Sequence, residues 1–219
     1  MAERPVERAR QRTRERVEQA RLTTRRLLGL DRSGPPPPET LAGHPLHPWT
    51  IPNAIGFLRL ALIPVFLVLA MESHDGQTIP STTIFAVVAG SDYLDGLAAR
   101  LTGQYSRLGA LLDPVVDRLL VLAGVAVCWR FDLLPRWALA ALLAREVAVV
   151  ALARIALRRG LDLKINWPGR LAVWPTMSAI AFALMGATSL AEVVLYVGLA
   201  LGFLALAMYF RAGISSLRS

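Results

Sequence analysis

The sequence predicts an all-α, polytopic integral membrane protein with six transmembrane helices. Of its 219 residues, 54% are apolar and only 18% are charged, so the chain is more apolar than an ordinary soluble domain. Six apolar segments rich in Ala and Leu approach the roughly 20 residues that a helix needs to cross a bilayer, whereas barrel strands are about half as long. Helices satisfy their own backbone hydrogen bonds in lipid, so helices are the expected spanning form.

The expected elements follow one another with short links. Residues 1–33 hold ten arginines against five acidic residues and lack the apolar core of a signal peptide, so we interpret them as an arginine-rich cytoplasmic tail. A Pro-rich spacer at 34–48 interrupts any helix. A membrane domain is expected over 49–219, with spans at 54–71, 80–101, 108–130, 135–157, 171–188 and 190–210.

The net charge of +8 does not indicate a nucleic-acid partner, because much of it lies in the tail. Short cytoplasmic loops carry an excess of Lys and Arg, and here basic residues flank the links between spans two and three and between spans four and five. The links between spans one and two and between spans five and six have no basic residue. Arg130 and Arg136 flank the link between spans three and four, on the outer side, and are exceptions to this pattern. This pattern predicts a multi-pass protein of the cell (inner) membrane with both termini in the cytoplasm.

Four aspartates lie near the cytoplasmic ends of the second and third expected spans. Asp92 and Asp95 are three residues apart on one helical face, and Asp113 and Asp117 are four residues apart on another. The turn between the two spans brings all four residues to a similar depth. Two carboxylate-bearing faces can therefore oppose each other at a cytoplasmic-face active site.

Four carboxylates packed this closely cannot all stay ionised without compensation, because like charges repel and burial disfavours the charged form. A divalent metal is the expected compensation, and oxygen ligands without Cys or His favour Mg²⁺ or Mn²⁺ over Zn²⁺. Four ligands on two helices can hold two ions, and two-metal sites clamp phosphoryl oxygens in displacement reactions. The aspartates therefore indicate phosphate chemistry with two Mg²⁺ or Mn²⁺ ions as cofactors.

Small and basic residues accompany the aspartates. Gly96 lets a substrate approach the helix closely, and Ala99 places only a small side chain on the same face. Arg100 offers a planar group of donors suited to phosphate. Gly109 allows close approach or helix packing one turn before Asp113. Each residue alone has a structural explanation in packing or topology, so only the combination indicates a site.

The spacing of these residues resembles the complete signature of the CDP-alcohol phosphatidyltransferase family. The signature residues are Asp92, Asp95, Gly96, Ala99, Arg100, Gly109, Asp113 and Asp117. The preceding TIPNAIGFLRLALIPVF is similar to the family's first-span entry, with Asn53 and Arg59, although Gly56 stands where Thr is common. The resemblance covers roughly residues 49 to 211 and leaves the arginine-rich tail unexplained.

The resemblance implies an integral-membrane enzyme that moves a phosphatidyl group from CDP-diacylglycerol to the hydroxyl of a small alcohol and releases CMP. It implies that Asp117 is the general base. Metal binding is implied for Asp92, Asp95, Asp113 and Asp117. Contacts to the CDP moiety are implied for Asp92, Gly96, Ala99 and Arg100. The implied partners are CDP-diacylglycerol, the alcohol or phosphoalcohol acceptor, membrane lipids and a second copy of the chain, since homodimers are common in the family.

Cations gather around the fourth expected span and the loop after it. Arg145 lies inside an apolar helix beside Glu146, which makes the pair either a functional site or a structural ion pair. A phosphorylated acceptor would suit this surplus of cations, although the positive-inside rule alone explains the loop residues. The predicted acceptor-binding residues are Arg145, Arg158, Lys164 and Arg170.

The Arg145-Glu146 pair followed by Gly169-Arg170 is similar to phosphatidylglycerophosphate synthases, whose acceptor is glycerol 3-phosphate. Members of that group usually carry Lys where Arg170 stands and a Lys-Thr soon after. Actinobacterial-type cardiolipin synthases of the same family, which use phosphatidylglycerol, have a relaxed version of this segment and a stretch much like SRLGALLDP at 106–114. Glycerol 3-phosphate is therefore the predicted acceptor, and cardiolipin synthesis is the alternative.

Three hypotheses from other classes stay open at this point, and one of them is a membrane anchor whose arginine-rich tail binds a partner. An intramembrane prenyltransferase would carry its aspartate motifs on helices farther apart in sequence and would lack the Gly-x-x-Ala-Arg element. A cation transporter would favour ligands near the bilayer midplane on broken helices, whereas these acids lie at one membrane face. The sequence favours the phosphatidyltransferase over the prenyltransferase and the transporter.

Overall fold

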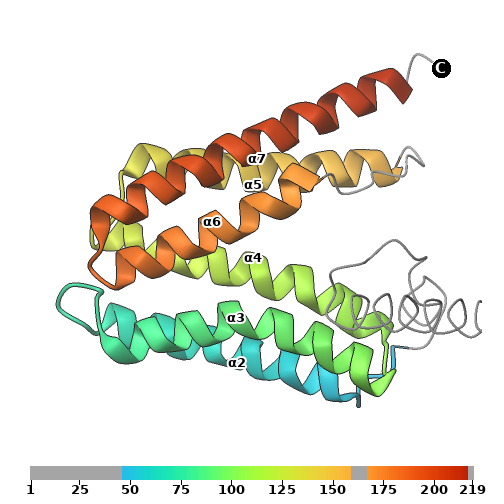
Figure 1. Cartoon of the computed structure of the whole chain (residues 1–219), viewed down its shortest axis with the longest axis horizontal. Helices are drawn as coiled ribbons and strands as arrows, with labels where there is room; N and C mark the ends of the chain where they lie inside the picture. Colours follow the sequence, from blue (N-terminus) through green and yellow to red (C-terminus); the bar gives the residue numbers. More distant parts are fainter. Residues whose placement is uncertain (1–45, 159–166, 217–219) are drawn as a thin grey trace, which may run out of the picture. The chain divides into compact units, whose positions relative to one another are not determined.

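The computed structural model describes residues 46–158 and 167–216, which form six α-helices and no strand (Figure 1). The helices are α2 (Ile51–Met71), α3 (Ile79–Thr102), α4 (Arg107–Arg130), α5 (Arg136–Arg158), α6 (Trp167–Leu184) and α7 (Thr188–Ser216). The predicted all-α class is confirmed for this part of the chain, with six helices where six were expected. The arginine-rich tail at 1–33 and most of the Pro-rich spacer at 34–48 lie outside the described residues.

Short polar side chains cap the first three helices. The Thr50 hydroxyl accepts from the Asn53 amide at 3.3 Å, and the Thr78 hydroxyl accepts from the Ser81 amide at 3.3 Å. The Ser106 hydroxyl accepts from the Gly109 amide at 2.9 Å, as an N-cap residue does three positions into a helix. These caps explain why the helices begin within a few residues of the starts expected from the apolar runs.

The expected fifth span at 171–188 is wrong at its end, because α6 stops at Leu184. Gly186 adopts a positive φ of 81° and its amide donates to the Ala183 carbonyl at 3.1 Å. The Ala187 amide donates to the Phe182 carbonyl at 2.9 Å, which completes a Schellman-type helix end. The local signals for this stop are Gly186 and the polar Thr188 and Ser189 that follow it, and they come after the point where the helix ends.

The chain divides into two compact units, and each is described by itself. The first unit contains the described residues up to Leu58 together with Gly90–Pro114. The second unit contains Arg59–Ala89 and the described residues from Val115 onward. Helices α2, α3 and α4 therefore contribute to both units, whereas α5, α6 and α7 belong to the second.

In the first unit, the segment before α2 is tied to the link between α3 and α4. The Leu108 amide donates to the Leu46 carbonyl at 3.3 Å, and the Ile51 amide donates to Gln104 Oε1 at 3.0 Å. Farther along α2, a β-carbon on Gly56 would lie 2.7 Å from Leu112 Cδ2. Glycine at position 56 therefore allows close packing between α2 and the start of α4.

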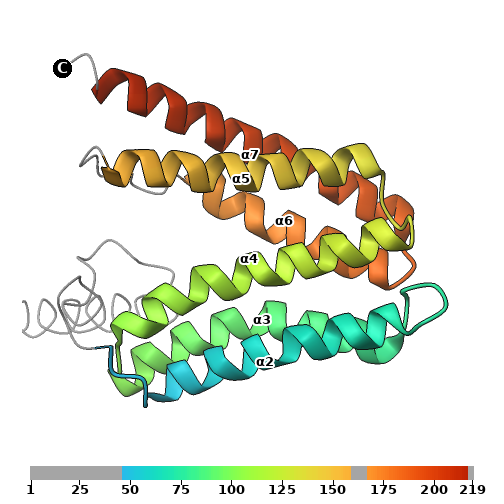
Figure 2. The same ribbon diagram turned by 180° about the vertical axis from the view of Figure 1, so that it is seen from behind.

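In the second unit, aliphatic residues such as Leu139 and Leu195 form the core together with two aromatic rings. The rings of Phe66 and Phe85 pack with centroids 5.3 Å apart. A β-carbon on Gly124 would lie 2.6 Å from Ile180 Cγ2, so α4 and α6 are in close contact there. Helix α7 packs on α6 and on α5, as both ribbon views show (Figure 2).

The outer faces of the helices carry large apolar side chains. Val68, Val87, Val147, Trp174 and Val193 are all exposed, on five different helices. A soluble protein rarely exposes so much apolar surface, whereas a membrane protein presents it to lipid. Two described helical segments are long and apolar enough to cross a membrane, α2 and Thr188–Met208 of α7.

Helices α3, α4 and α5 interrupt their apolar sequences with charged residues, such as Asp95, Asp117 and Arg145. Charged side chains within membrane helices are rare and usually mark function. The structure thus contains apolar helices of the kind that cross membranes, while the expected arrangement of six spans stays a prediction.

Candidate active site

The aspartates predicted to form the site lie on α3 and α4. Asp92 and Asp95 are separated by about one helical turn on α3, and Asp113 and Asp117 by about one turn on α4. Asp95 is buried, with 5% of its surface exposed, whereas Asp92 is exposed and the two α4 carboxylates are half-buried. Each pair therefore shares one face of its helix, as the spacing predicted.

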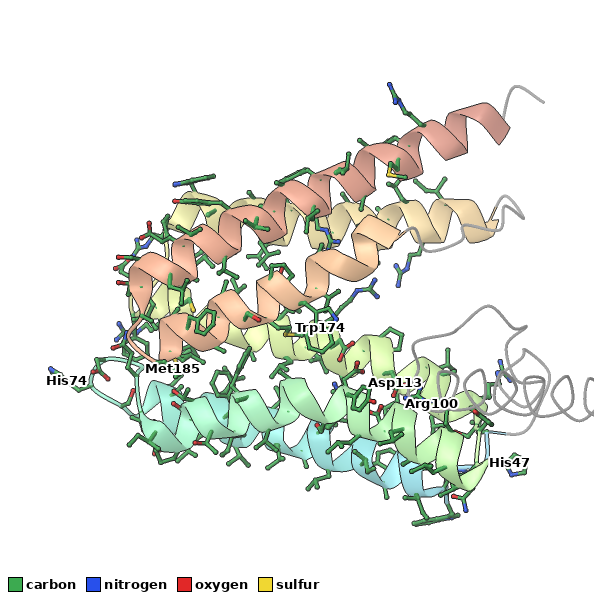
Figure 3. The ribbon with its side chains drawn as sticks, in the orientation of Figure 1. His47, His74, Arg100, Asp113, Trp174 and Met185 are labelled. Atoms are coloured by element: carbon green, nitrogen blue, oxygen red, sulfur yellow. The ribbon has the colours of Figure 1, made fainter. Side chains whose placement is uncertain are left out.

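Arg100 follows the first aspartate pair on the same helix, and Figure 3 shows it on α3 and Asp113 on α4. A β-carbon on Gly96 would lie 3.3 Å from Arg100 Nη1. The Arg100 guanidinium thus lies over the backbone of Gly96, one turn earlier. The glycine leaves room for this cation, which a larger residue at position 96 would displace.

A buried amide holds the start of α4. Asn53, which is 1% exposed, donates from Nδ2 to the carbonyls of His47 at 2.9 Å and Pro48 at 3.1 Å. Its Oδ1 accepts from the Ser106 hydroxyl at 2.8 Å. A β-carbon on Gly109 would lie 2.7 Å from that same Oδ1. Gly109 is therefore required by the packing of Asn53, which accounts for the packing role predicted for it.

Arg59 of α2 pairs with the second aspartate of α4. Its Nη2 donates to Asp117 Oδ1 at 2.7 Å, and its Nε donates to the Val88 carbonyl of α3 at 3.2 Å. The arginine is only 1% exposed, whereas the Asp117 side chain is 33% exposed. Arg59 therefore holds the Oδ1 atom of Asp117, the proposed base, while the carboxylate group stays accessible.

A second group of charges lies on α4 and α5. The Arg145 Nη1 donates to Glu146, and Glu146 Oε2 lies 3.8 Å from Arg118 Nε. The Arg145 Nε atom is buried and has no hydrogen-bond partner within the described residues. A β-carbon on Gly202 of α7 would lie 3.0 Å from that atom. Arg145 thus lies against α7 as a half-buried cation, and its buried Nε is an orphaned donor.

The donor chemistry of the aspartates suits a hard divalent cation, because all four supply carboxylate oxygens and none is accompanied by Cys or His. Within residues 46–158 and 167–216, no three Asp, Glu, His or Cys side chains are gathered as a ready metal-binding group. The metal site therefore stays a prediction, supported by the residue types and their helical spacing.

The predicted acceptor residues are only partly described. Arg145 is placed as above, whereas Lys164 lies outside the described residues. Arg158 ends α5 and Arg170 lies in the first turn of α6, and their side chains also lie outside the described part. That the four cations form one acceptor-binding site stays a prediction.

Sequence reasoning gave no role to Asn53, Arg59, Ser106 or Arg118. One signal could have singled out Arg59, because it is the only charged residue in the apolar sequence of α2. Ser106 also carried a signal, since it directly precedes the expected third span and is a favoured N-cap residue. Their partners lie more than 50 residues away, so no local pattern could identify them.

Comparison with known proteins establishes the class of this chain. The sequence profile described as CDP-alcohol phosphatidyltransferase matches residues 49–204, which include every aspartate discussed above. The chain therefore belongs to the CDP-alcohol phosphatidyltransferase family, whose members are membrane-bound transferases that generally depend on divalent metal. The resemblance expected from the sequence is confirmed, as is the class of enzyme.

Relatives with two different names are similar to the chain. The CDP-diacylglycerol--glycerol-3-phosphate 3-phosphatidyltransferase of Shigella flexneri is 32% identical over 72% of this chain and 87% of its own length. The protein of the same name from Bacillus subtilis is 29% identical over 63% of this chain and 77% of its own length. The cardiolipin synthase (CMP-forming) of Streptomyces coelicolor is 38% identical over 62% of this chain. That match spans 65% of the Streptomyces protein, just under two thirds.

Proposed function

We propose that the chain transfers the phosphatidyl group of CDP-diacylglycerol to the hydroxyl of glycerol 3-phosphate. The products are phosphatidylglycerophosphate and CMP. The observation that carries the proposal is the family's aspartate pattern on α3 and α4, within the region that the family profile matches. The prenyltransferase and cation-transporter hypotheses have no support from the comparisons.

In this proposal, Asp117 takes the proton from the acceptor hydroxyl. The hydroxyl oxygen then attacks the phosphorus of the phosphatidyl group, and the bond from that phosphorus to the oxygen of CMP breaks. Arg100 and Asp92, together with the small residues Gly96 and Ala99, contact the CDP moiety. Arg100 offers parallel donors that match phosphate oxygens.

Two divalent ions, Mg²⁺ or Mn²⁺, would be held by the four aspartates, Asp92, Asp95, Asp113 and Asp117. When bound, such ions neutralise the charge of the pyrophosphate and of the leaving CMP. The oxygen-only donor set and the helical spacing of the two pairs support this assignment.

The acceptor is assigned to the cations around α5. The orphaned Nε of Arg145 supports an anionic ligand there, because a buried donor without a partner is costly and a phosphate oxygen would satisfy it. Arg158, Lys164 and Arg170 are proposed to complete this site. The glycerol-3-phosphate transferase names of the Shigella and Bacillus relatives support the same acceptor.

Cardiolipin synthesis from CDP-diacylglycerol and phosphatidylglycerol is the second candidate. The specific observation in its favour is sequence identity, which is 38% with the Streptomyces cardiolipin synthase against 29% and 32% with the two glycerol-3-phosphate transferases. Both reactions would use the same aspartates, so only the acceptor side distinguishes them.

We further propose six membrane spans in the cell (inner) membrane, with both termini and the aspartates on the cytoplasmic side, and a homodimer. The basic residues of the links and the apolar outer helix faces support this arrangement. Reporter fusions after Gln77 and after Arg107 would test it, since the first should report the outer side and the second the cytoplasm. Cross-linking in detergent would test the dimer.

The acceptor assay uses full-length protein purified in detergent with CDP-diacylglycerol labelled in its phosphatidyl group. Glycerol 3-phosphate, phosphatidylglycerol and inositol phosphate are offered separately with Mg²⁺ or Mn²⁺, and the lipid product is identified by chromatography. Labelled phosphatidylglycerophosphate is the expected product. Cardiolipin formed with phosphatidylglycerol alone would replace the first candidate by the second.

A further inference from the structure

The strongest unexplained feature is the single charged residue of α2. Arg59 lies in the middle of an otherwise apolar helix and is 1% exposed. A buried charge in a membrane helix is costly unless it is paired and hydrogen-bonded. Its two described hydrogen bonds, to Val88 and Asp117, therefore matter to the stability of this arrangement.

The arginine fork joins three helices at fixed points. Nε donates to the Val88 carbonyl, which lies one turn before Asp92 on α3, and Nη2 donates to Asp117 Oδ1 on α4. The guanidinium is planar and rigid, so two bonds from it to different helices fix both its own orientation and that of the carboxylate. A Lys at this position would supply the charge without this planar geometry.

We propose that Arg59 is a positioning residue for Asp117 and holds its carboxylate in the orientation that receives the acceptor's proton. This inference rests on the proposed function, in which Asp117 is the general base. A base must lie within hydrogen-bond reach of the proton that it takes, so its side-chain orientation controls the rate. One hydrogen bond from Arg59 ends on Asp117 itself, and another ends on the Val88 carbonyl, one turn before Asp92 on α3.

The kinetic test compares Arg59→Gln and Arg59→Lys with a matched control. Arg136→Gln also breaks an Arg-Asp pair with an N–O distance of 2.7 Å, but that pair, with Asp132, is exposed. Turnover is measured as CMP release with glycerol 3-phosphate and phosphatidylglycerol, each normalised to protein that binds CDP-diacylglycerol.

We expect Arg59→Gln to lower kcat about 100-fold, the effect of an ångström-scale misplacement of a reacting group. The KM for CDP-diacylglycerol should stay within about twofold, because Asp92, Asp95, Asp113 and Arg100, which are proposed to hold the metal and the CDP moiety, are unchanged. Arg59→Lys should restore part of kcat, and Arg136→Gln should behave as wild type. Unchanged kcat per binding-competent protein in Arg59→Gln would show a structural role only and overturn the proposal.

A double-mutant cycle tests the pair without turnover. Thermal unfolding of the metal-free full-length chain is measured for Arg59→Gln, Asp117→Asn and the double variant. The proposal predicts that the double variant is clearly more stable than the sum of the two single effects predicts, whereas additive effects would overturn it. Absence of CMP release from wild type with every acceptor would overturn the proposed function and the positioning role together, whereas additive unfolding overturns the positioning role alone.

Discussion

Replacement of Gly109 by Ala tests whether the buried Asn53 amide organises the start of α4. The new β-carbon would lie 2.7 Å from Asn53 Oδ1 and 3.2 Å from Ser106 Oγ. Contacts of 2.7 Å to a β-carbon are too short to persist, so one group must move. Asn53 is 1% exposed and bonded on both sides of its amide, so it cannot retreat without breaking its hydrogen bonds.

The magnitude follows from those bonds. The Asn53 side chain donates twice at 2.9 and 3.1 Å and accepts once at 2.8 Å. At about 1 kcal/mol each, their loss would destabilise the fold by about 3 kcal/mol. Ala favours the helix over Gly by about 1 kcal/mol, which leaves a net loss of about 2 kcal/mol. For a chain of this size, that lowers the Tm by roughly 4–8 °C.

The matched control is Gly90→Ala, also in a helix, because a β-carbon at position 90 would meet nothing within 4 Å. Gly90→Ala should leave the Tm unchanged or raise it, since helix propensity improves by up to about 1 kcal/mol. Both variants are unfolded thermally in detergent and followed by the loss of helical circular dichroism. Equal Tm values for the two variants would refute the reasoning about Asn53.

Three further predictions concern the base, the acceptor and the core. Asp117→Asn should abolish CMP release yet still bind CDP-diacylglycerol in a binding assay, and loss of both would contradict its role as base. Gly202→Val should displace the Arg145 guanidinium and raise the KM for glycerol 3-phosphate about tenfold, the weight of one charge-assisted hydrogen bond. An equal rise in the KM for CDP-diacylglycerol would argue against an acceptor site there. Gly124→Ala would put a β-carbon 2.6 Å from Ile180 Cγ2 and should destabilise the fold by about 1–3 kcal/mol in thermal unfolding, without changing kcat.

The helices were largely predictable, because their signals are local. Apolar runs and preceding Thr and Ser caps indicate where α2, α3 and α4 begin, and α4 starts one residue before the expected 108. The end of α6 was placed four residues too late, since Met185, Gly186 and Ala187 extend the apolar run past Leu184. The chain reverses there because Gly186 adopts a positive φ, and a single glycine in a sequence is only a weak signal for such a helix end.

The aspartate pairs were also predictable, since i to i+3 and i to i+4 spacings place residues on one helix face whatever packs against it. The partners of these residues were not predictable. Arg59 and Asp117 are 58 residues apart, and Asn53 and Ser106 are 53 residues apart. Which helix faces meet is decided by packing of the whole chain, and local periodicity does not contain that information.

The glycines, too, were predictable in their position but not in the contacts that require them. Gly96 and Gly109 were expected to allow close approach, yet only the structure shows that Arg100 occupies the space beside Gly96 and Asn53 the space beside Gly109. Gly202 is adjacent to Arg145 through the packing of α7 on α5, between residues far apart in sequence. The sequence shows where these glycines stand, but only the structure shows which side chain lies where each β-carbon would be.

The proposed transfer of the phosphatidyl group is tested most directly by the stoichiometry of the reaction. Purified full-length protein is incubated with CDP-diacylglycerol, glycerol 3-phosphate and Mg²⁺ or Mn²⁺, and CMP and the lipid product are quantified together. We expect equal amounts of CMP and phosphatidylglycerophosphate, and neither product from the Asp117→Asn variant. CMP formed without a phosphatidyl product, or equal turnover by Asp117→Asn, would contradict it.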